Sequence, residues 1–285
     1  MSFMFNFSRE SEADKPALEP KRDHVEWFDS EEVVPKTQMK DLNEIAKHAK
    51  MFTCGEVEIG HVVTSEALAN ILSDTDMNNA TGCAEKSHSD LVTAKYEGGL
   101  KIWECTYDLV EYLKNNSDTI KLESAKVLDL GCGAGILGIY AFINGAHVTF
   151  QDYNKEVLEH VTIPNVLLNI DEEDNVSENI RKCKFYSGDW ESFNKIDETE
   201  SYDVILTSET IYNIANYDKL INLFIKRLSR TGAVYLAAKT CYFGVGGGVR
   251  QFESKLKNNG TFQSEICWTC SGGIQREILK ITHRL

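Results

Sequence analysis

Short apolar runs alternate with amphipathic stretches along the C-terminal two thirds of the chain. Five apolar runs have the length and the β-branched content of buried strands: 126–130, 147–152, 183–187, 202–207 and 233–239. Four stretches between or before them carry apolar residues at helical spacing: 104–114, 135–144, 155–168 and 217–229. Strands and helices in alternation predict a parallel sheet with helices on both faces.

The C-terminal pattern is different. Residues 249–257 predict a helix, and residues 262–269 and 276–283 predict two strands joined by a turn with two glycines. Two strands so joined favour an antiparallel hairpin. The expected fold is therefore α/β, with a Rossmann-like sheet of seven strands that ends in an antiparallel hairpin.

The first 85 residues look unlike the rest. They are polar and rich in charge, and they hold three of the four prolines without any sustained alternation. We interpret residues 1–85 as a mostly disordered, flexible N-terminal tail and residues 86–285 as the folded domain. A short helix over 66–72 and a β-prone stretch over 88–96 are further expectations.

Composition narrows the class of protein. The chain has 30 basic and 44 acidic residues, a net charge of −14, which argues against nucleic acid as the main partner and suits a basic protein partner. The same charge also keeps a protein soluble. We find neither an apolar run of about 20 residues nor a signal peptide pattern, so we expect a soluble intracellular protein. The eight cysteines are scattered with one CxxC pair, which predicts reduced thiols and no metal site.

A glycine-rich turn carries the clearest chemistry. Residues 127–138 read VLDLGCGAGILG, an apolar strand followed by Gly131, Gly133 and Gly135 and then a helical pattern. Glycine permits positive φ and close approach of the backbone to a ligand, and the helix that follows supplies free N–H groups. Asp152 ends the next strand, where its carboxylate could accept hydrogen bonds from both ribose hydroxyls. Together these features predict a nucleotide-cofactor site.

Two kinds of cofactor compete for this site, because dinucleotide-binding folds also place glycines and an acid at this spacing. Asp129 lies inside the strand, two positions before Gly131, where it could brace the turn or meet the ammonium group of a methyl donor. Dinucleotide dehydrogenases usually continue with parallel strands rather than a terminal hairpin. Both features favour a methyl donor over a nicotinamide cofactor, and a plain glycine turn in an α/β protein is the other alternative.

Taken together, residues 127–138, Asp152 and the SETIYN motif at 208–213 resemble the seven-stranded methyltransferases that use S-adenosylmethionine. The acid and aromatic at Glu209 and Tyr212 are similar to those of protein methyltransferases acting on lysine or histidine. Longer stretches resemble the protein-histidine methyltransferases that modify large-ribosomal-subunit protein three: 87–91 with 96–106, then 150–154, then 242–249. The resemblance covers about residues 87–285 and the short N-terminal segment FMFNF at 3–7.

The resemblance implies a set of site residues. Bordering the cofactor it places Ile102, Trp103, Glu104, Cys105, Thr106, Asp129, Gly131, Gly133, Gly135, Gln151, Asp152, Tyr153, Asn154, Gly188, Asp189, Trp190 and Ser208. Toward the substrate it places Glu209, Tyr212 and Asn213. Two of these have a structural alternative: Trp103 as a core residue and 188–190 as an ordinary turn. The glycine-rich loop 244–248 could fold over a peptide or be a flexible turn without contacts. His88 is a candidate for self-methylation or a surface histidine.

Methyl transfer to histidine makes modest chemical demands. A histidine with a pKa near 6.5 is mostly neutral at pH 7, whereas a lysine near 10.4 must lose a proton at a cost of ~4.6 kcal/mol. The enzyme has to select one ring nitrogen by accepting the proton of the other, and Glu209 and Asn213 are candidates for that role. The resemblance implies methylation of the Nε2 (tele) nitrogen of a histidine in a basic ribosomal protein.

The resemblance also implies a monomer in the cytoplasm and nucleus, including the nucleolus, and an effect on ribosome assembly or translation. Two alternatives to the histidine enzyme are kept. One is a lysine methyltransferase acting on a translation factor or a chaperone. The other is a ribosome assembly factor that binds the cofactor without catalysis.

Overall fold

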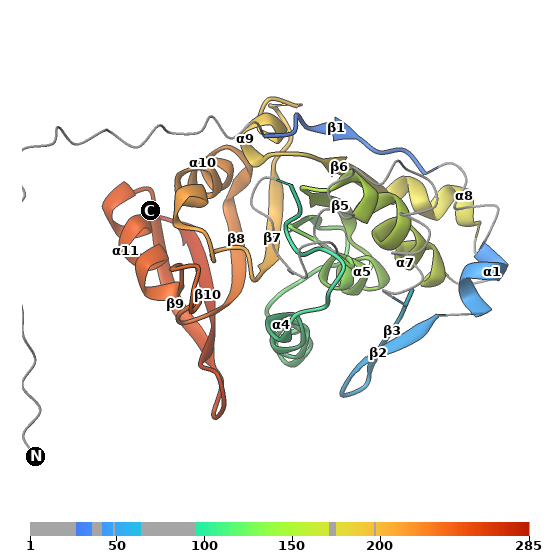
Figure 1. The fold of residues 1–285 in the computed structure, drawn as a ribbon, viewed down its shortest axis with the longest axis horizontal. Helices are drawn as coiled ribbons and strands as arrows, with labels where there is room; N and C mark the ends of the chain where they lie inside the picture. Colours follow the sequence, from blue (N-terminus) through green and yellow to red (C-terminus); the bar gives the residue numbers. More distant parts are fainter. Residues whose placement is uncertain are drawn as a thin grey trace, which may run out of the picture.

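The computed structural model describes residues 27–35, 42–47, 49–63, 95–170, 175–196 and 198–284. Its main sheet has eight strands in the order β1-β6-β5-β4-β7-β8-β10-β9. The strands are β1 (Glu31–Glu32), β4 (Lys126–Leu130), β5 (His147–Asp152), β6 (Cys183–Ser187), β7 (Tyr202–Ser208), β8 (Leu228–Lys239), β9 (Phe262–Thr269) and β10 (Arg276–His283). Figure 1 shows the sheet crossing the molecule from β9 to β6.

The five central strands are parallel, and β8, β10 and β9 pair antiparallel. From β4 the chain moves outward to β5 and β6, and then returns past β4 to β7 and β8. The strand order therefore reverses between β4 and β7, and open α/β sheets bind ligands beyond the carboxyl ends of the strands at such a point. The predicted α/β class, the parallel sheet and the C-terminal hairpin are confirmed, and β1 adds an eighth strand to the seven that were predicted.

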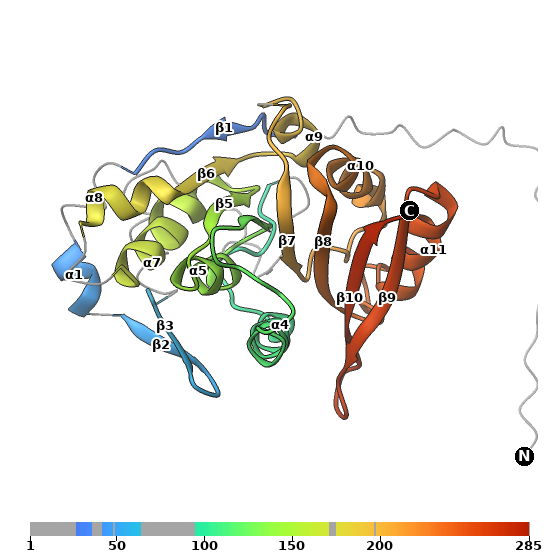
Figure 2. The ribbon, with the colours of Figure 1, turned by 180° about the vertical axis from the view of Figure 1, so that it is seen from behind.

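Helices cover both faces of the sheet (Figures 1 and 2). Residues of β4 alternate between two separate cores, with Val127 in one and Leu128 and Leu130 in the other, as the period of two in a strand requires. The first core includes α4 (Glu104–Asn115), α5 (Ile136–Ile143) and α7 (Ile163–Leu168). The second includes α9 (Trp190–Phe193), α10 (Tyr217–Arg227) and α11 (Val249–Asn259).

Two predicted helices differ from the observed ones. The stretch 155–168 consists of α6 (Lys155–Val157), a π-helical segment η1 (Leu158–Thr162) and α7. At the end of η1 the Thr162 hydroxyl donates to the Gly133 carbonyl at 2.6 Å. Helix α10 ends at Arg227 and not at Ser229, since Leu228 already pairs with Tyr202 of β7. Strand β8 is accordingly longer than the predicted 233–239.

Part of the region interpreted as a tail is regular structure. It contains β1, a short helix α1 (Leu42–Lys47) and an antiparallel hairpin of β2 (Lys50–Cys54) and β3 (Val57–His61). Phe52 and Ile59 of the hairpin are fully buried in the first core, so the tail interpretation is wrong for these segments. The expected helix at 66–72, His88 and most of the β-prone stretch 88–96 lie outside the described residues.

The remaining elements are small: α8 (Val176–Asn179), a single 3₁₀ turn η2 (Ile180–Lys182) and a second, η3 (Ile214–Asn216). Among the residues described, no helix is long and apolar enough to pass through a lipid bilayer. The same residues contain no cluster of histidine, cysteine, aspartate and glutamate side chains suited to a metal ion.

Candidate active site

A pocket lies beyond the carboxyl ends of β4, β5 and β7. The structure brings together at its wall most of the residues named from the sequence: Ile102, Trp103, Thr106, Gly131, Gly133, Asp152, Tyr153, Gly188, Asp189, Trp190, Ser208, Glu209 and Tyr212. Residues from five different loops therefore meet at the point where the strand order reverses.

The glycine turn after β4 is shaped for close approach. Gly131 and Gly133 line the cavity with φ of 65° and 50°, which L side chains rarely adopt. A Cβ at Gly131 would lie 2.7 Å from Cγ2 of Thr210, and one at Gly133 would lie 3.0 Å from the Gly99 carbonyl oxygen. Gly135 is the N-cap of α5 and packs against Thr162, behind the lining. Side chains at the first two positions would fill the cradle.

Asp152 ends β5 at the cavity wall. Its Oδ2 accepts a 2.8 Å hydrogen bond from the Gly133 amide, and its Oδ1 accepts a 3.1 Å bond from the Asn154 amide. Burial raises the pKa of this carboxyl to about 6, against the lowering effect of those two hydrogen bonds. A carboxylate has further lone pairs, so Asp152 can still accept hydrogen bonds from a ligand in the cavity.

Asp129 does not line the cavity. Its carboxyl is 1% exposed, and Oδ2 accepts a 2.8 Å hydrogen bond from the Gly138 amide in the first turns of α5. Burial raises the pKa of Asp129 to about 8. Of the two roles considered for Asp129, the structure shows the bracing of the strand against the helix after the turn.

Gln151 and Asn154 position neighbouring loops and do not line the cavity. The Gln151 amide donates to the Gly188 carbonyl at 2.7 Å and accepts from the Trp190 indole at 2.9 Å. Asn154 accepts from the Glu97 amide at 3.1 Å and donates to the Lys95 carbonyl at 2.7 Å. The two side chains therefore hold the segments that cover the cavity from either side.

The segment before α4 contributes some of the residues expected of it. Trp103 lines the cavity, and its indole donates to the Gly98 carbonyl at 3.3 Å. Thr106 shares a 2.9 Å hydrogen bond with Ser208 at the end of β7. Cys105 is fully buried in the first core, and Glu104 is exposed and pairs with Lys239 at 3.1 Å, so neither lines the cavity.

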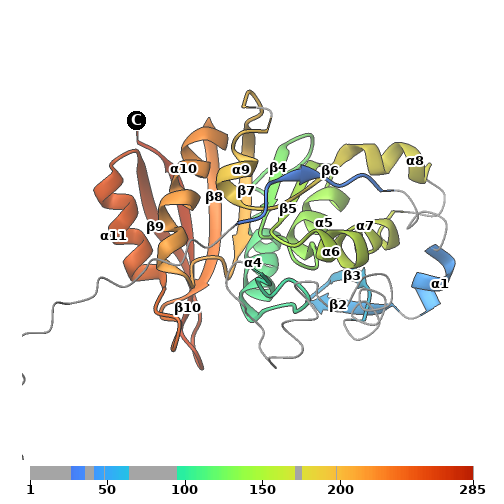
Figure 3. The ribbon, with the colours of Figure 1, turned by 45° about the horizontal axis from the view of Figure 1, so that its top comes forward.

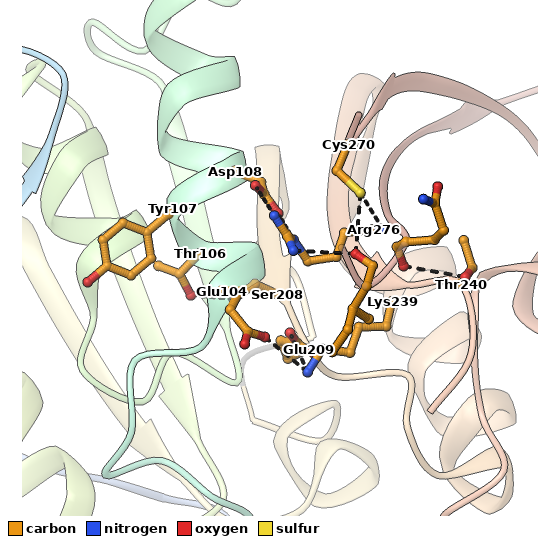
Figure 4. A network of polar contacts seen from close by, with 12 residues as sticks. Glu104, Thr106, Tyr107, Asp108, Ser208, Glu209, Lys239, Thr240, Cys270 and Arg276 are labelled. Atoms are coloured by element: carbon orange, nitrogen blue, oxygen red, sulfur yellow. Dashed lines mark hydrogen bonds and ion pairs between the residues drawn. The ribbon is translucent and has the colours of Figure 1, made fainter. Parts of the chain in front are cut away.

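Glu209 combines a strained backbone with a buried charge. Its φ is 59°, an uncommon conformation for a residue other than glycine and one that is found at functional sites. Neither carboxylate oxygen makes a hydrogen bond of good geometry to any described residue, although Lys239 Nζ lies 3.7 Å from Oε1. Figure 4 shows the Glu209 and Glu104 carboxylates both close to the Lys239 ammonium. The cavity therefore contains a carboxylate with free acceptor capacity.

Tyr212 and Asn213 behave differently from each other. The Tyr212 hydroxyl donates to the Glu97 carboxylate inside the cavity, and burial followed by the Glu97 charge raises the pKa of that hydroxyl. Asn213 does not line the cavity. Its side chain turns back to accept from the Ala215 amide at 3.0 Å and caps η3.

Sequence reasoning missed several lining residues, among them Trp27, Glu97, Lys101 and Asn216. Glu97 and Lys101 lie within the stretch 96–106 that carried the resemblance, so that stretch was the available signal. Nothing in the pattern of residues 1–85 pointed to Trp27.

Comparison with known proteins finds similarity to methyltransferases that are named for lysine or histidine. The model of a family described as "Lysine methyltransferase" matches residues 90–245. The "Histidine protein methyltransferase 1 homolog" of Dictyostelium discoideum is 43% identical over 69% of this chain and 62% of its own length. The Mus musculus protein of the same name is 38% identical over 95% of this chain and 76% of its own length. "Protein N-lysine methyltransferase METTL21A" of Xenopus tropicalis is 27% identical over 50% of this chain.

Proposed function

We propose, because this chain belongs to the family of the histidine protein methyltransferase 1 homologues, that it methylates the Nε2 nitrogen of a histidine in large-ribosomal-subunit protein three. Membership in this family makes the chain a methyltransferase with S-adenosylmethionine as methyl donor. That donor supplies an electrophilic methyl group on a sulfonium. The observation that carries the choice of histidine is the buried carboxylate of Glu209 in the cavity wall, which has an ion pair with Lys239 but no hydrogen bond of good geometry to a described residue.

The cavity has the features that an adenosine cofactor needs. Asp152 offers acceptor capacity for the ribose hydroxyls, and each such charge-assisted bond contributes about 1.5 to 3 kcal/mol. Because Gly131 and Gly133 have no side chains, their backbone is accessible to the methionine half of S-adenosylmethionine. Trp103 supplies an aromatic face for the sulfonium, an attraction of roughly 0.5 to 2 kcal/mol. We assign the loop 188–190 to contact with the adenine ring.

Glu209 is the residue we assign to the target imidazole. In neutral histidine one ring nitrogen carries a proton and the other a lone pair. If Glu209 accepts the proton of Nδ1–H, Nε2 presents its lone pair to the methyl group, and alignment of the two provides most of the acceleration. Lys239 Nζ lies 3.7 Å from Oε1 of this carboxylate. Asn213 loses this candidate role because its amide oxygen caps η3.

A lysine target is the second candidate. The matching family model is described as "Lysine methyltransferase", and the relative from Xenopus tropicalis is a protein N-lysine methyltransferase. A buried carboxylate beside a substrate ammonium would stabilise the protonated amine, which is the unreactive form. The same Glu209 that suits a neutral imidazole therefore disfavours lysine.

The substrate we propose is a basic protein. The chain carries a net charge of −14, which attracts a basic partner. Exposed apolar side chains lie close to the SETIYN motif: Phe243 is 89% exposed on a loop whose Gly247 amide bonds the Tyr212 carbonyl at 3.0 Å, and Ile214 is 50% exposed. Such side chains can contact the residues that flank a target histidine. We place the protein in the cytoplasm and nucleus, including the nucleolus, where ribosomal proteins are made and assembled.

The test is methyl transfer from labelled S-adenosylmethionine to an extract that lacks the endogenous enzyme. Acid hydrolysis and mass spectrometry of the labelled protein should give tele-methylhistidine. Replacing the target histidine in that protein should abolish labelling. Label on lysine would move the protein to the second candidate, and absence of label despite cofactor binding would support the assembly factor without catalysis. Asp152→Asn provides a matched negative control.

A further inference from the structure

We propose that residues 27–33 form a strap that completes the cofactor cavity, and that Trp27 contacts the adenine end of the cofactor. The strap precedes the predicted catalytic domain in the sequence by more than 50 residues, and no pattern in it pointed to a ligand. The inference rests on S-adenosylmethionine as the cofactor but not on histidine as the target. It therefore concerns cofactor binding alone.

The strap is fixed to the edge of the main sheet. Strand β1 pairs antiparallel with β6, Glu31 opposite Ser187 and Glu32 opposite Tyr186, and Figure 3 shows β1 along β6. The Val33 amide continues this ladder with a 2.8 Å hydrogen bond to the Phe185 carbonyl, and Val33 is buried. The strap is thus an added edge strand whose N-terminal end reaches the cavity.

That end packs directly on two loops of the cavity wall. The Asp189 amide donates to the Phe28 carbonyl at 2.9 Å, and the Phe28 amide donates to the Tyr153 hydroxyl at 3.2 Å. The Phe28 ring stacks on that of Tyr153 with centroids 5.2 Å apart. A Cβ at Gly188 would lie 2.5 Å from the Asp29 carbonyl oxygen, so the loop after β6 and the strap are in close contact.

Trp27 itself lines the cavity beside a charged pair. Lys219 Nζ lies 3.8 Å from the centroid of the Trp27 ring and 2.6 Å from Oδ1 of Asp189. Lys219 therefore holds the indole and the carboxylate at the same end of the cavity. The Trp27 and Tyr153 rings are nearly perpendicular, with centroids 5.7 Å apart. The indole is oriented by contacts on two sides.

This arrangement has the chemistry that recognises an aminopurine. A nucleobase offers a flat π surface for an aromatic ring, and adenine offers an exocyclic amino donor for a carboxylate such as Asp189. Asp189 already accepts from the Glu191 amide at 3.0 Å and pairs with Lys219, so its orientation is set before a ligand arrives. Trp27 precedes β1, and Asp189 and Trp190 follow β6, away from Glu209 after the end of β7. We assign the adenine to their end.

The experiment measures binding of S-adenosylhomocysteine by isothermal titration calorimetry to the full chain and three variants. Trp27→Ala should raise the Kd at least tenfold, and Trp27→Phe should stay within about threefold of the wild type because the aromatic face is kept. Glu32→Ala, an exposed position of the same strap, is the control and should leave the Kd unchanged. A Kd of Trp27→Ala within twofold of the wild type would overturn the proposal.

A second measurement uses the unaltered chain, in case Trp27→Ala folds poorly. Hydrogen–deuterium exchange of the amides in residues 27–35 should slow at least fivefold when S-adenosylhomocysteine is added in excess. Unchanged exchange there, with slowed exchange around Gly133, would show that the cofactor binds without the strap and would overturn the proposal. Methylation of lysine instead of histidine would defeat the proposed function and leave both results intact. If S-adenosylhomocysteine does not bind the wild-type chain at all, both the strap proposal and the assignment of S-adenosylmethionine as the cofactor are wrong.

Discussion

The carboxylate of Asp152 accepts a 2.8 Å hydrogen bond from the backbone amide of Gly133, so the end of β5 holds the turn that follows β4. Both residues line the cavity. The acceptor that we assign to the cofactor ribose is therefore the same group that orients the glycine turn. Burial raises the pKa of this group to about 6, which makes its ionisation sensitive to mildly acidic pH.

Cofactor affinity should fall as the pH drops below about 6. Protonation of Asp152 removes an acceptor for ribose hydroxyls, so the Kd of S-adenosylhomocysteine should rise about tenfold per pH unit below the pKa of about 6. Calorimetry at pH 7.5, 6.0 and 5.0 checks this.

Stability changes in the opposite sense, because a raised carboxyl pKa makes this group's contribution to the unfolding free energy fall as pH rises from about 4 to about 6. Asp152→Asn should bind weakly with a flat profile over this window.

Asp129→Asn should stabilise the protein at neutral and alkaline pH. The carboxyl is 1% exposed with a pKa raised by burial to about 8, so its contribution to the unfolding free energy is lost as pH rises from about 4 to about 8. An amide keeps the acceptor for the Gly138 amide without a buried charge. The difference in unfolding free energy, variant minus wild type, should be several kcal/mol larger at pH 8 than at pH 4. One unit of pKa shift corresponds to about 1.4 kcal/mol. Denaturant titrations at both pH values measure it, and an equal difference at both would contradict the prediction.

Glu209→Gly should raise stability and abolish methyl transfer. Glycine relieves the φ of 59° and removes a buried carboxylate without hydrogen bonds, while Lys239 keeps its 3.1 Å ion pair with Glu104, for a gain of about 1 to 3 kcal/mol. The rate of transfer at saturating substrate should fall at least about 100-fold, in the range for loss of a positioned proton acceptor. The Kd of S-adenosylhomocysteine should not change. Single-turnover rates and thermal melts test these statements.

Asn213→Ala is the matched comparison for Glu209, because both are polar residues of the SETIYN motif. Loss of the cap on η3 should cost about 0.5 to 2 kcal/mol of unfolding free energy. Methyl transfer at saturating substrate should stay within about threefold of the wild type. A drop as large as that of Glu209→Gly would restore Asn213 to the catalytic role and count against our assignment.

Phe243→Ala should weaken binding of the protein substrate. This side chain is 89% exposed, so its removal should change the unfolding free energy by less than about 0.5 kcal/mol. We expect a KM for the protein substrate several times higher with an unchanged Kd for S-adenosylhomocysteine. Initial rates over a range of substrate concentrations check the KM. Val34→Ala, another exposed apolar position at 55%, is the control, and an equal effect of both would show that general surface hydrophobicity is responsible.

The parts of the fold that sequence reasoning predicted correctly are those in which each element carries its own pattern. The apolar run 126–130 and the glycine turn after it identify a strand and a ligand loop through local periodicity and backbone freedom. Strand β1 has no such signal: its two residues are both exposed glutamates, and they form a strand only because the edge of β6 is there to pair with. Trp27 reaches the cavity by that pairing, which no local pattern records.

Within the site, residue type and spacing could not separate side chains that enter the cavity from those that support it. Gln151 and Asp152 are adjacent polar residues at the end of one strand, yet only Asp152 lines the cavity. The alternation of a strand assigns them to opposite faces, and the identity of the inward face depends on the whole sheet. The direction of Asn213 depends on η3, a turn too short to be seen in the sequence.

The pairing of β1 with β6 also sets an order of events during synthesis. Glu31 meets Ser187, a partner made about 150 residues later, so at roughly 5 to 20 residues per second the strap waits about 10 to 30 s on the ribosome for its neighbour. Contacts between residues so far apart close large loops and form slowly. On the strap proposal, residues 27–33 can therefore contribute to nucleotide binding only after Ser187, about two thirds of the way along the chain, has been made.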